Sequence, residues 1–340
     1  MKILSKDNLL LVSIIIPCRN EEKLIGKCLD SLLSQNFPKE KIEILVIDGR
    51  SEDKTREIVN QYKNNYSFIK LIDNSQKFQV FALNKGIKAS KGEIIIRCDA
   101  HAEYSRNYIE KLVNWLLGDK RIGNVGGVCI NKPIKNSLGT RAIAYTLAHP
   151  FCVGPNRFRI GAKKIIFVDT VPFGAWRKEI FKEVGFFDPI FLKAEDLNFN
   201  IRLKKAGYKI LLDPDIRIIY YPRDSFKKLY SMLFDYAYWK VFIIKKLKVI
   251  PSLRQFAPPL FILYLFLALV FSFSTLLVWI PLGIYIFLSL IFSLQISLKH
   301  GDIKILPFIF LTFIVSHISY GIGYWKGVCC ILFEAPKKDL

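Results

Sequence analysis

The first part of the chain alternates short apolar runs with amphipathic stretches. Strands alternating with helices predict an α/β fold with a mostly parallel sheet covered by helices. Ligands bind outside the carboxyl ends of the strands in such sheets, so those ends are where chemistry is expected. The β-branched runs that predict strands are 11–17, 42–48, 68–73, 93–98 and 124–130. The stretches with apolar residues at helical spacing are 21–35, 53–62, 78–89 and 106–117.

Beyond residue 130 the pattern is less regular. Residues 131–162 lack a clear period, and we expect them to form a flexible region over the site. Further strands are predicted at 164–171 and 209–213, and a helix at 194–206. Residues 225–248 mix aromatic and basic side chains in an amphipathic stretch. This composition favours a helix in the lipid headgroup plane, and a core helix of the soluble domain is the alternative.

Uncharged apolar residues dominate the C-terminal part. No Asp, Glu, Lys or Arg occurs from Gln255 to Leu298, and 305–325 is a second uncharged run. A bilayer is crossed by about 20 apolar residues. Spans are therefore predicted near 258–278 and 281–298, with a third near 305–325. We expect a cytosolic α/β domain over 1–224, an amphipathic interfacial segment over 225–254, and a membrane domain over 255–330 with two to three transmembrane helices.

The charge lies mainly in the N-terminal part. The net charge of the chain is +21, of which +19 falls within residues 1–255. A basic domain beside a membrane indicates contact with membrane lipids of anionic headgroup, or with phosphates in a substrate. Nucleic acid is the competing interpretation of this charge. The chain has no aromatic–basic RNA signature and no zinc-finger spacing, so we expect no nucleic-acid partner.

The charged residues around the apolar runs predict the membrane orientation. Lys and Arg precede the first run and separate the second predicted span from the third, which favours a cytoplasmic side for both loops. We therefore expect a multi-pass membrane protein with a cytoplasmic N-terminal domain. Three full spans would place the tail and its lysines outside, and a re-entrant third segment would remove this conflict. Seven cysteines without a CxxC pair fit a reducing compartment.

Acidic residues stand where the predicted strands end. Asp48 ends the second strand, and Asp99 and His101 follow the fourth. A carboxylate and an imidazole two residues apart could hold one divalent ion, Mg²⁺ or, because of the imidazole, Mn²⁺. Glu195 and Asp196 open a predicted helix, where the helix dipole favours carboxylates. Asp196 could there act as the general base for an acceptor hydroxyl.

In this order the motifs resemble those of glycosyltransferase family 2, inverting enzymes of the GT-A fold. The resemblance covers about residues 10–250 and includes IIIPCRNEE, VIDGRSEDKT, NKGIKASKGEIIIRCDAH and AEDLNFNIRLKKAGYKI. The D-A-H variant and VDTVPFGAWR are most similar to the ExoA-type transferases of succinoglycan and exopolysaccharide assembly. The resemblance implies the following roles: Pro17, Arg19 and Glu21 border the nucleotide sugar, Asp48 binds its uracil end, Asp99 contacts ribose or metal, His101 replaces the second metal-binding acid, and Asp196 is the catalytic base beside Glu195.

The sequence departs from the family pattern at two places. Gly49 stands where a second acid commonly follows Asp48, which weakens the indication for uridine. The Q-x-x-R-W motif of processive synthases is absent. Arg223, Tyr236 and Trp239 occupy that region, as candidate acceptor-binding or interfacial residues. The absence favours the addition of one sugar per event.

These observations predict a membrane-attached inverting glycosyltransferase with a divalent metal cofactor. It would transfer one sugar from a nucleotide-diphosphate sugar, most simply a UDP-sugar, to a lipid-linked saccharide. One alternative is a polyprenyl-phosphate sugar synthase, whose anionic acceptor needs no general base. A second is a non-catalytic membrane module that binds nucleotide sugars. The Asp48, Asp99 and Asp196 set argues against the second alternative.

Overall fold

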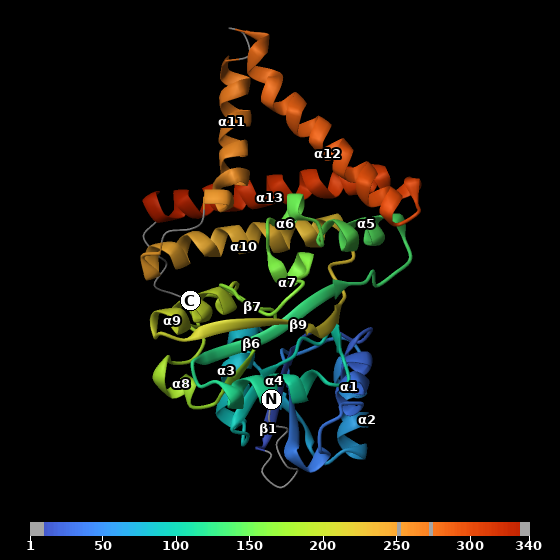
Figure 1. The fold of residues 1–340 in the computed structure, drawn as a ribbon, viewed down its shortest axis with the longest axis vertical. Helices are drawn as coiled ribbons and strands as arrows, with labels where there is room; N and C mark the ends of the chain where they lie inside the picture. The colour runs from blue at the N-terminus through green and yellow to red at the C-terminus, as the bar shows by residue number, and fades with distance from the viewer. Residues whose placement is uncertain (1–9, 250–252, 272–274, 334–340) are drawn as a thin grey trace. The chain divides into compact units, whose positions relative to one another are not determined.

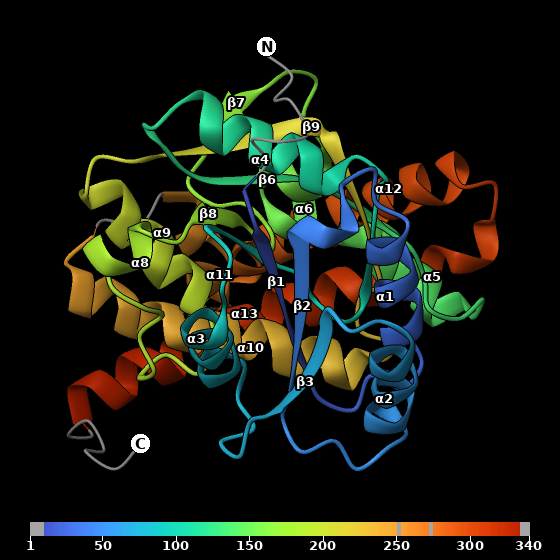
Figure 2. The same cartoon turned by 90° about the horizontal axis from the view of Figure 1, so that it is seen from below.

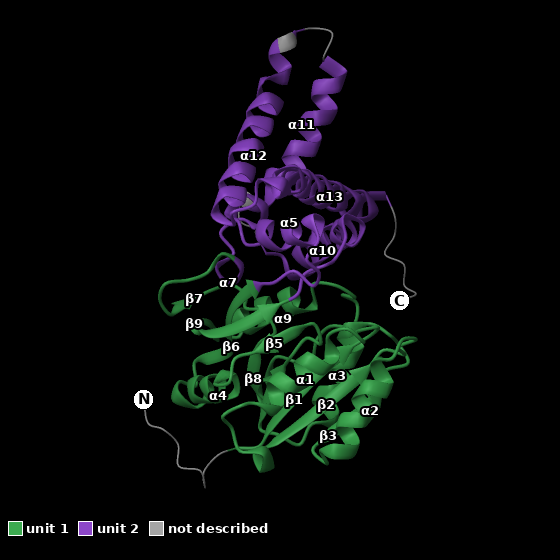
Figure 3. Ribbon diagram, turned by 90° about the vertical axis from the view of Figure 1, so that its right-hand side faces the viewer, with its two compact units in different colours: residues 1–130, 160–220 green, residues 131–159, 221–340 purple. Residues whose placement is uncertain are grey.

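The computed structural model describes residues 10–249, 253–271 and 275–333. The chain forms two compact units (Figure 3). The first comprises residues 1–130 and 160–220, and the second comprises residues 131–159 and 221–340. Each unit is therefore assembled from two separate stretches of the chain.

A nine-stranded mixed sheet forms the centre of the first unit (Figure 1). Its order is β3-β2-β1-β4-β8-β6-β9-β5, and β7 pairs with β9. The strands are β1 (Val12–Cys18), β2 (Ile42–Asp48), β3 (Ile69–Asp73), β4 (Ile94–Arg97), β5 (Ala102–Tyr104), β6 (Ile122–Asn131), β7 (Ile166–Phe167), β8 (Ala175–Arg177) and β9 (Lys209–Tyr220). The accompanying helices are α1 (Ile25–Leu33), α2 (Thr55–Asn65), α3 (Gln79–Ala89), α4 (Tyr108–Gly118), α8 (Ile180–Glu183) and α9 (Glu195–Lys205), with a 3₁₀ turn at Lys39–Lys41.

The first four strands of the sheet order are parallel, as the alternation of strands and helices predicts. Every residue of β2 is buried. Its nearly continuous apolar sequence is typical of a parallel strand that helices cover on both faces. α1 and α2 lie together on one side of these strands and α3 on the other (Figure 2). The parallel register brings the last residues of β1, β2 and β3, which are Cys18, Asp48 and Asp73, to one edge.

The other half of the sheet contains the antiparallel pairs. β8 pairs with β4 and β6, and β9 pairs with β5 and β7. The sequence pattern does not predict β5 and β8, because strands of three residues are too short to show an alternation. The strand predicted at 164–171 is wrong outside Ile166–Phe167, whereas the one predicted at 209–213 extends to Tyr220.

The second unit is helical. Its longest helices are α10 (Phe226–Leu247), α11 (Ala257–Phe271), α12 (Ile280–Lys299) and α13 (Leu306–Phe333). The shorter elements are α5 (Leu138–Thr146), α6 (Pro150–Val153), α7 (Arg157–Ile160, at the boundary in sequence), and 3₁₀ turns at Leu253–Phe256, Leu276–Trp279 and Ile303–Ile305. The expectation of an irregular segment over 131–162 is therefore wrong where α5 forms.

Helices α10 and α13 lie side by side, and α11 and α12 stand away from this pair (Figure 1). Glycines allow the close approach. A Cβ on Gly323 would lie 2.3 Å from the carbonyl oxygen of Phe234, and one on Gly327 would lie 2.9 Å from that of Tyr238. These contacts advance together along both sequences, so the two helices run parallel.

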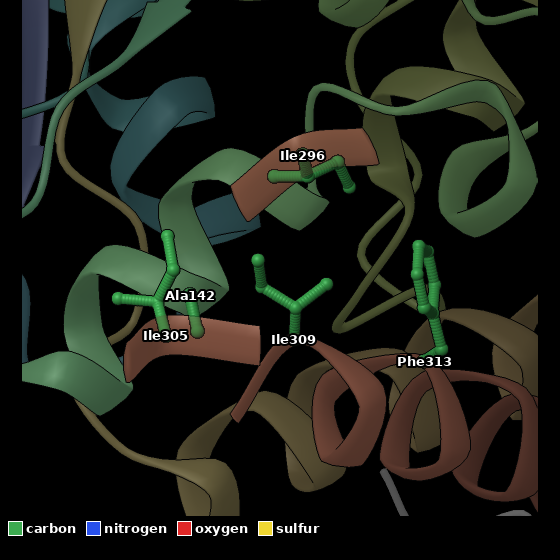
Figure 4. Packing of buried hydrophobic residues seen from close by; sticks show 5 residues of the cluster. All are labelled: Ala142, Ile296, Ile305, Ile309 and Phe313. Carbon is green, nitrogen blue, oxygen red and sulfur yellow. The ribbon is translucent and has the colours of Figure 1, made fainter. Parts of the chain in front are cut away.

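A small apolar cluster joins α5 to the C-terminal helices. Its buried members are Ala142, Ile296, Ile305, Ile309 and Phe313 (Figure 4). An ion pair between Arg141 and Asp302, 2.8 Å apart, lies at the same junction. The segment before α6 thus packs into the helical unit although it is far away in sequence.

Two stretches of helix are long and apolar enough to cross a membrane, Leu277–Lys299 and Ile303–Phe333. They differ in packing. In the most apolar part of the first stretch 11% is buried inside the protein, compared with 44% in the second. α11 has 15 residues and ends at Phe271, earlier than the span predicted near 258–278. Residues 272–274 of that predicted span lie outside the described residues.

Candidate active site

Asp48 is fully buried at the carboxyl edge of the parallel strands. Arg56 from α2 donates to its carboxylate at 2.7 Å and also bonds Asp73 at the end of β3. The backbone N–H of Ser51 donates to the same carboxylate at 3.1 Å. Hydrogen bonds to Asp48 and Asp73 raise the pKa of Arg56 above its ordinary value. Asp48 is therefore held in one orientation by charged and backbone donors.

The geometry explains the glycine after Asp48. A Cβ on Gly49 would lie 2.9 Å from the carbonyl oxygen of Lys77 and 3.4 Å from the Cβ of Arg19. The loops after β1 and β3 therefore pass too close to residue 49 for a side chain. The local path of the backbone therefore favours glycine at this position.

Four non-glycine residues at this edge have a left-handed backbone. Asn20, Arg50 and Lys77 follow β1, β2 and β3, and Ala194 precedes α9; their φ values are 56°, 57°, 66° and 58°. Such conformations cost about 1–3 kcal/mol each and cluster at functional sites. Their concentration in these loops supports the same edge as the candidate site.

A buried guanidinium connects the end of β4 to the start of α9. Arg97 Nε donates to Asp99 Oδ1 at 3.0 Å, and its Nη1 donates to Glu195 Oε1 at 3.2 Å. All three side chains are buried. Gln79 from α3 also donates to Glu195, at 3.1 Å. The structure thus brings together the acids of two motifs that lie about a hundred positions apart.

The carboxylates of this cluster outnumber its one guanidinium group. Burial would lower the pKa of Arg97, but the carboxylates of Asp99 and Glu195 raise it above its ordinary value. Burial raises the pKa of Glu195, with Arg97 opposing this shift and Asp196 adding to it. Three carboxylates around one guanidinium leave negative charge uncompensated. A divalent cation bound here would balance that charge, and a proton on Glu195 would reduce it.

His101 is oriented by a carboxylate. Its Nδ1 lies 3.1 Å from Glu21 Oε1, and its ring centroid lies 5.3 Å from that of Tyr220. Metal-binding histidines typically bond a carboxylate through the other ring nitrogen, which would make Nε2 of His101 the ligating atom. Among the described residues, no group of three or more His, Cys, Asp or Glu could hold a metal ion. A pair of ligands still fits Mg²⁺ or Mn²⁺, since such ions complete their shell with water and substrate phosphates.

Asp196 lies in the first turn of α9, beside buried Glu195. Its Oδ1 accepts a hydrogen bond from the N–H of Leu197 at 2.8 Å, and its side chain is half-buried. Asp196 is therefore an accessible carboxylate next to the Arg97 cluster.

The remaining predicted residues fall into two groups. Pro17 and Glu21 stand in β1 and the loop after it, and Arg19 lies 3.9 Å from Glu52 with its side chain partly exposed. Arg223, Tyr236 and Trp239 belong to the other unit. Arg223 and Tyr236 are exposed, and Trp239 packs against Phe242.

Sequence reasoning missed Arg97, Gln79 and Arg56. The signal for Arg97 was present, because a single arginine ends the otherwise apolar run IIIR. A charged residue in a buried strand requires a partner of opposite charge. The pattern gives no indication that the partners are Asp99 and Glu195.

Comparisons with known proteins identify relatives over most of the chain. The family described as glycosyl transferase family 2 matches residues 13–185. A protein of Methanococcus voltae named dolichyl N-acetyl-alpha-D-glucosaminyl phosphate 3-beta-D-2,3-diacetamido-2,3-dideoxy-beta-D-glucuronosyltransferase is 36% identical over 242 residues, 69% of this chain and 74% of that protein. Succinoglycan biosynthesis protein ExoA of Rhizobium meliloti is 28% identical over 319 residues, 92% of this chain and 93% of that protein.

Solved structures share the fold. Mannosyltransferase PcManGT from Pyrobaculum calidifontis, in complex with GDP-Man and Mn²⁺, has a TM-score of 0.60 and 18% identity, covering 93% of this chain and 88% of that one. The family match spans β1 to α8 and includes Asp48, Asp99 and His101. The chain therefore belongs to glycosyl transferase family 2 and is a glycosyltransferase of polysaccharide or glycan synthesis with a GT-A fold.

Proposed function

We propose that the protein is a membrane-attached inverting transferase that adds a single sugar from a UDP-linked donor to a lipid-linked saccharide. The observation that carries the proposal is the network through Arg97, which joins Asp99 after β4 to Glu195 at the start of α9. The network links the proposed nucleotide-binding acid to Glu195, which precedes the proposed base Asp196 in α9. Asp48 and the loop after β1 would bind the nucleoside at the same edge.

The donor would be held by Asp48, Asp99 and the loop residues Pro17, Arg19 and Glu21. Asp99 and His101 would hold a divalent ion, Mn²⁺ or Mg²⁺, and such an ion neutralises negative charge on a departing diphosphate. The solved structures support this assignment by analogy, because PcManGT is in complex with GDP-Man and Mn²⁺ and GalNAc-T7 with UDP, GalNAc and Mn²⁺.

Asp196 would accept the proton of the acceptor hydroxyl as that oxygen attacks the anomeric carbon. Attack from the face opposite the diphosphate inverts the anomeric configuration in one displacement. Glu195 would fix the start of α9 through Arg97 and Gln79 rather than touch the acceptor, since it is buried and both partners hold it. Asp196 is the more exposed of the two carboxylates.

The acceptor assignment rests on the relatives and on the helical unit. The name of the Methanococcus voltae relative specifies a dolichyl-phosphate-linked sugar as acceptor. Arg223, Tyr236 and Trp239 lie next to or within α10 and would contact such an acceptor or the bilayer. Attachment to the membrane would bring the reactive hydroxyl of an amphiphilic acceptor to the enzyme.

The test is nucleotide release by the full chain in detergent, with Mn²⁺, a panel of UDP- and GDP-sugars, and membrane lipid extract. We expect UDP release from one donor, dependent on extract, and lost in Asp99→Ala and Asp196→Asn. Asp215→Asn, on an exposed carboxylate of β9, is the matched control and is expected to retain activity. Full activity of Asp196→Asn would rule out the base assignment. The structure of the lipid product would separate a β-glycoside from a lipid-phosphate sugar.

A further inference from the structure

Length alone would make α13 a membrane span. Its 28 residues extend for about 42 Å at 1.5 Å per residue, more than the roughly 30 Å of a hydrocarbon core. Its neighbour constrains it, however. α10 runs parallel to α13, and the backbone contacts at Gly323 and Gly327 hold the two helices together. Any orientation of α13 in a bilayer is therefore shared by α10.

α10 carries charge along its whole length. Lys227 and Lys228 stand in its first turn, Asp235 and Lys240 in the middle, and Lys245 and Lys246 in the last turn. The lysines of both ends are exposed. A charged residue at the centre of a bilayer is unfavourable even on insertion scales. Lys240 bonds the hydroxyl of Tyr320 on α13 at 3.1 Å, so this ammonium would enter the hydrocarbon with α13.

The other flank of α13 packs on α5 and α6. Its N-terminal half packs on α5, beside the Arg141–Asp302 ion pair. Its His317 is bonded to the carbonyl of Phe151 in α6 and to the hydroxyl of Tyr285, both at 2.9 Å. With α10 on one flank and α5 and α6 on the other, α13 offers less of its apolar surface to lipid chains than α12 does, since 44% of its apolar stretch is buried against 11%.

Helices α11 and α12 have the opposite character. They contain no Asp, Glu, Lys or Arg before Lys299, and they follow one another in the sequence. Large apolar side chains are exposed along both, among them Phe266, Leu269 and Phe287 at 63%, 64% and 62%. Hydrocarbon is the solvent that fits such surfaces.

We infer that α13 does not cross the bilayer: the α10–α13 pair lies flat at an anionic membrane surface, and α11 and α12 alone enter it as a hairpin. The inference rests on the proposed membrane attachment and deepens it. Lysines of α10 would contact lipid phosphates, which attract basic helices at the interface. Both ends of a hairpin emerge on one side, so the end of α13 lies on the same side as the first unit. This removes the conflict between three spans and a lysine-bearing tail.

The test is cysteine labelling of the full chain in intact and permeabilised cells. Exposed Cys329 is replaced by serine, and single reporters are introduced as Asp215→Cys in β9, Lys304→Cys between α12 and α13, and Phe333→Cys at the end of α13. A membrane-impermeant maleimide is then applied. We expect the three reporters to behave alike, with labelling appearing only on permeabilisation. The parent without reporters gives the background.

Labelling of Phe333→Cys in intact cells, with Asp215→Cys protected, would show that α13 crosses the bilayer and overturn the inference. Sugar transfer is measured in the same membranes. Uniform labelling without transfer would count against the proposed function while supporting the topology. Sugar transfer together with labelling of Phe333→Cys in intact cells would support the proposed function and overturn the topology.

Discussion

Arg97 is the residue on which the geometry of the site depends most. It forms ion pairs with both Asp99 and Glu195, whose carboxylates are buried. Removing one partner of a buried charge pair costs about 3–5 kcal/mol, because the remaining charge has no counterpart. Arg97→Met is therefore expected to lower the thermal unfolding midpoint and abolish transfer. Arg97→Lys retains the charge without the two-sided bridge, so partial activity is expected.

Arg121 provides the matched control for that variant. Its side chain is 72% exposed and pairs with Asp119 at 2.8 Å. Surface changes of this kind are usually within about 0.5 kcal/mol. Arg121→Met should unfold at nearly the same temperature as the unmodified protein. Equal unfolding midpoints for Arg97→Met and Arg121→Met would contradict the role assigned to the buried guanidinium.

Gly49→Asp introduces the acid that is common in the family at this position, yet we expect it to impair the enzyme. The Cβ would meet the carbonyl oxygen of Lys77 at 2.9 Å, so one of the two loops must move. We expect Gly49→Asp to raise the KM for the donor and to lower turnover. Gly49→Ala, which adds only the Cβ, should show most of the same loss. A gain of donor affinity in Gly49→Asp would show that the loops yield.

Much of the site could be predicted at this scale, and the reason is topological. Asp48 ends β2 and Asp99 follows β4, so their position at one edge of the parallel strands follows from chain direction. Arg97 was missed as a bridge because its partner Glu195 lies 98 positions away. No local pattern encodes that distance.

At the scale of elements, two helical glycines make a matched pair. A Cβ on Gly323 of α13 would lie 2.3 Å from a backbone oxygen of α10, whereas one on Gly283 of α12 would meet nothing within 4 Å. Replacing glycine by alanine within a helix gains about 1 kcal/mol of intrinsic propensity. Gly283→Ala should therefore be neutral or stabilising, and Gly323→Ala destabilising, in thermal unfolding of the detergent-solubilised protein. Equal shifts for both would exclude tight α10–α13 packing.

The sequence pattern predicts the position of these helices but not their surroundings. The strands β1, β2 and β3 were located to within a residue, because they are long, apolar and β-branched. Apolar length also located α12 and α13, but it could not distinguish lipid from protein as the surroundings of each. That distinction depends on neighbours such as α10 and α5, which are brought to α13 from distant parts of the sequence.

At the scale of the whole molecule, the proposed membrane attachment would use two features, a net charge of +21 and the apolar hairpin of α11 and α12. A high-salt wash distinguishes these two contributions. At 1 M ionic strength the Debye length falls to about 3 Å, which weakens binding through charge, whereas the burial of apolar surface is not weakened. The exposed apolar side chains of α11 and α12 predict that the protein stays with pelleted membranes in such a wash and is released by detergent. The double variant Lys245→Gln, Lys246→Gln should also stay. Release by salt alone would mean that charge holds the protein and that the hairpin remains outside the hydrocarbon.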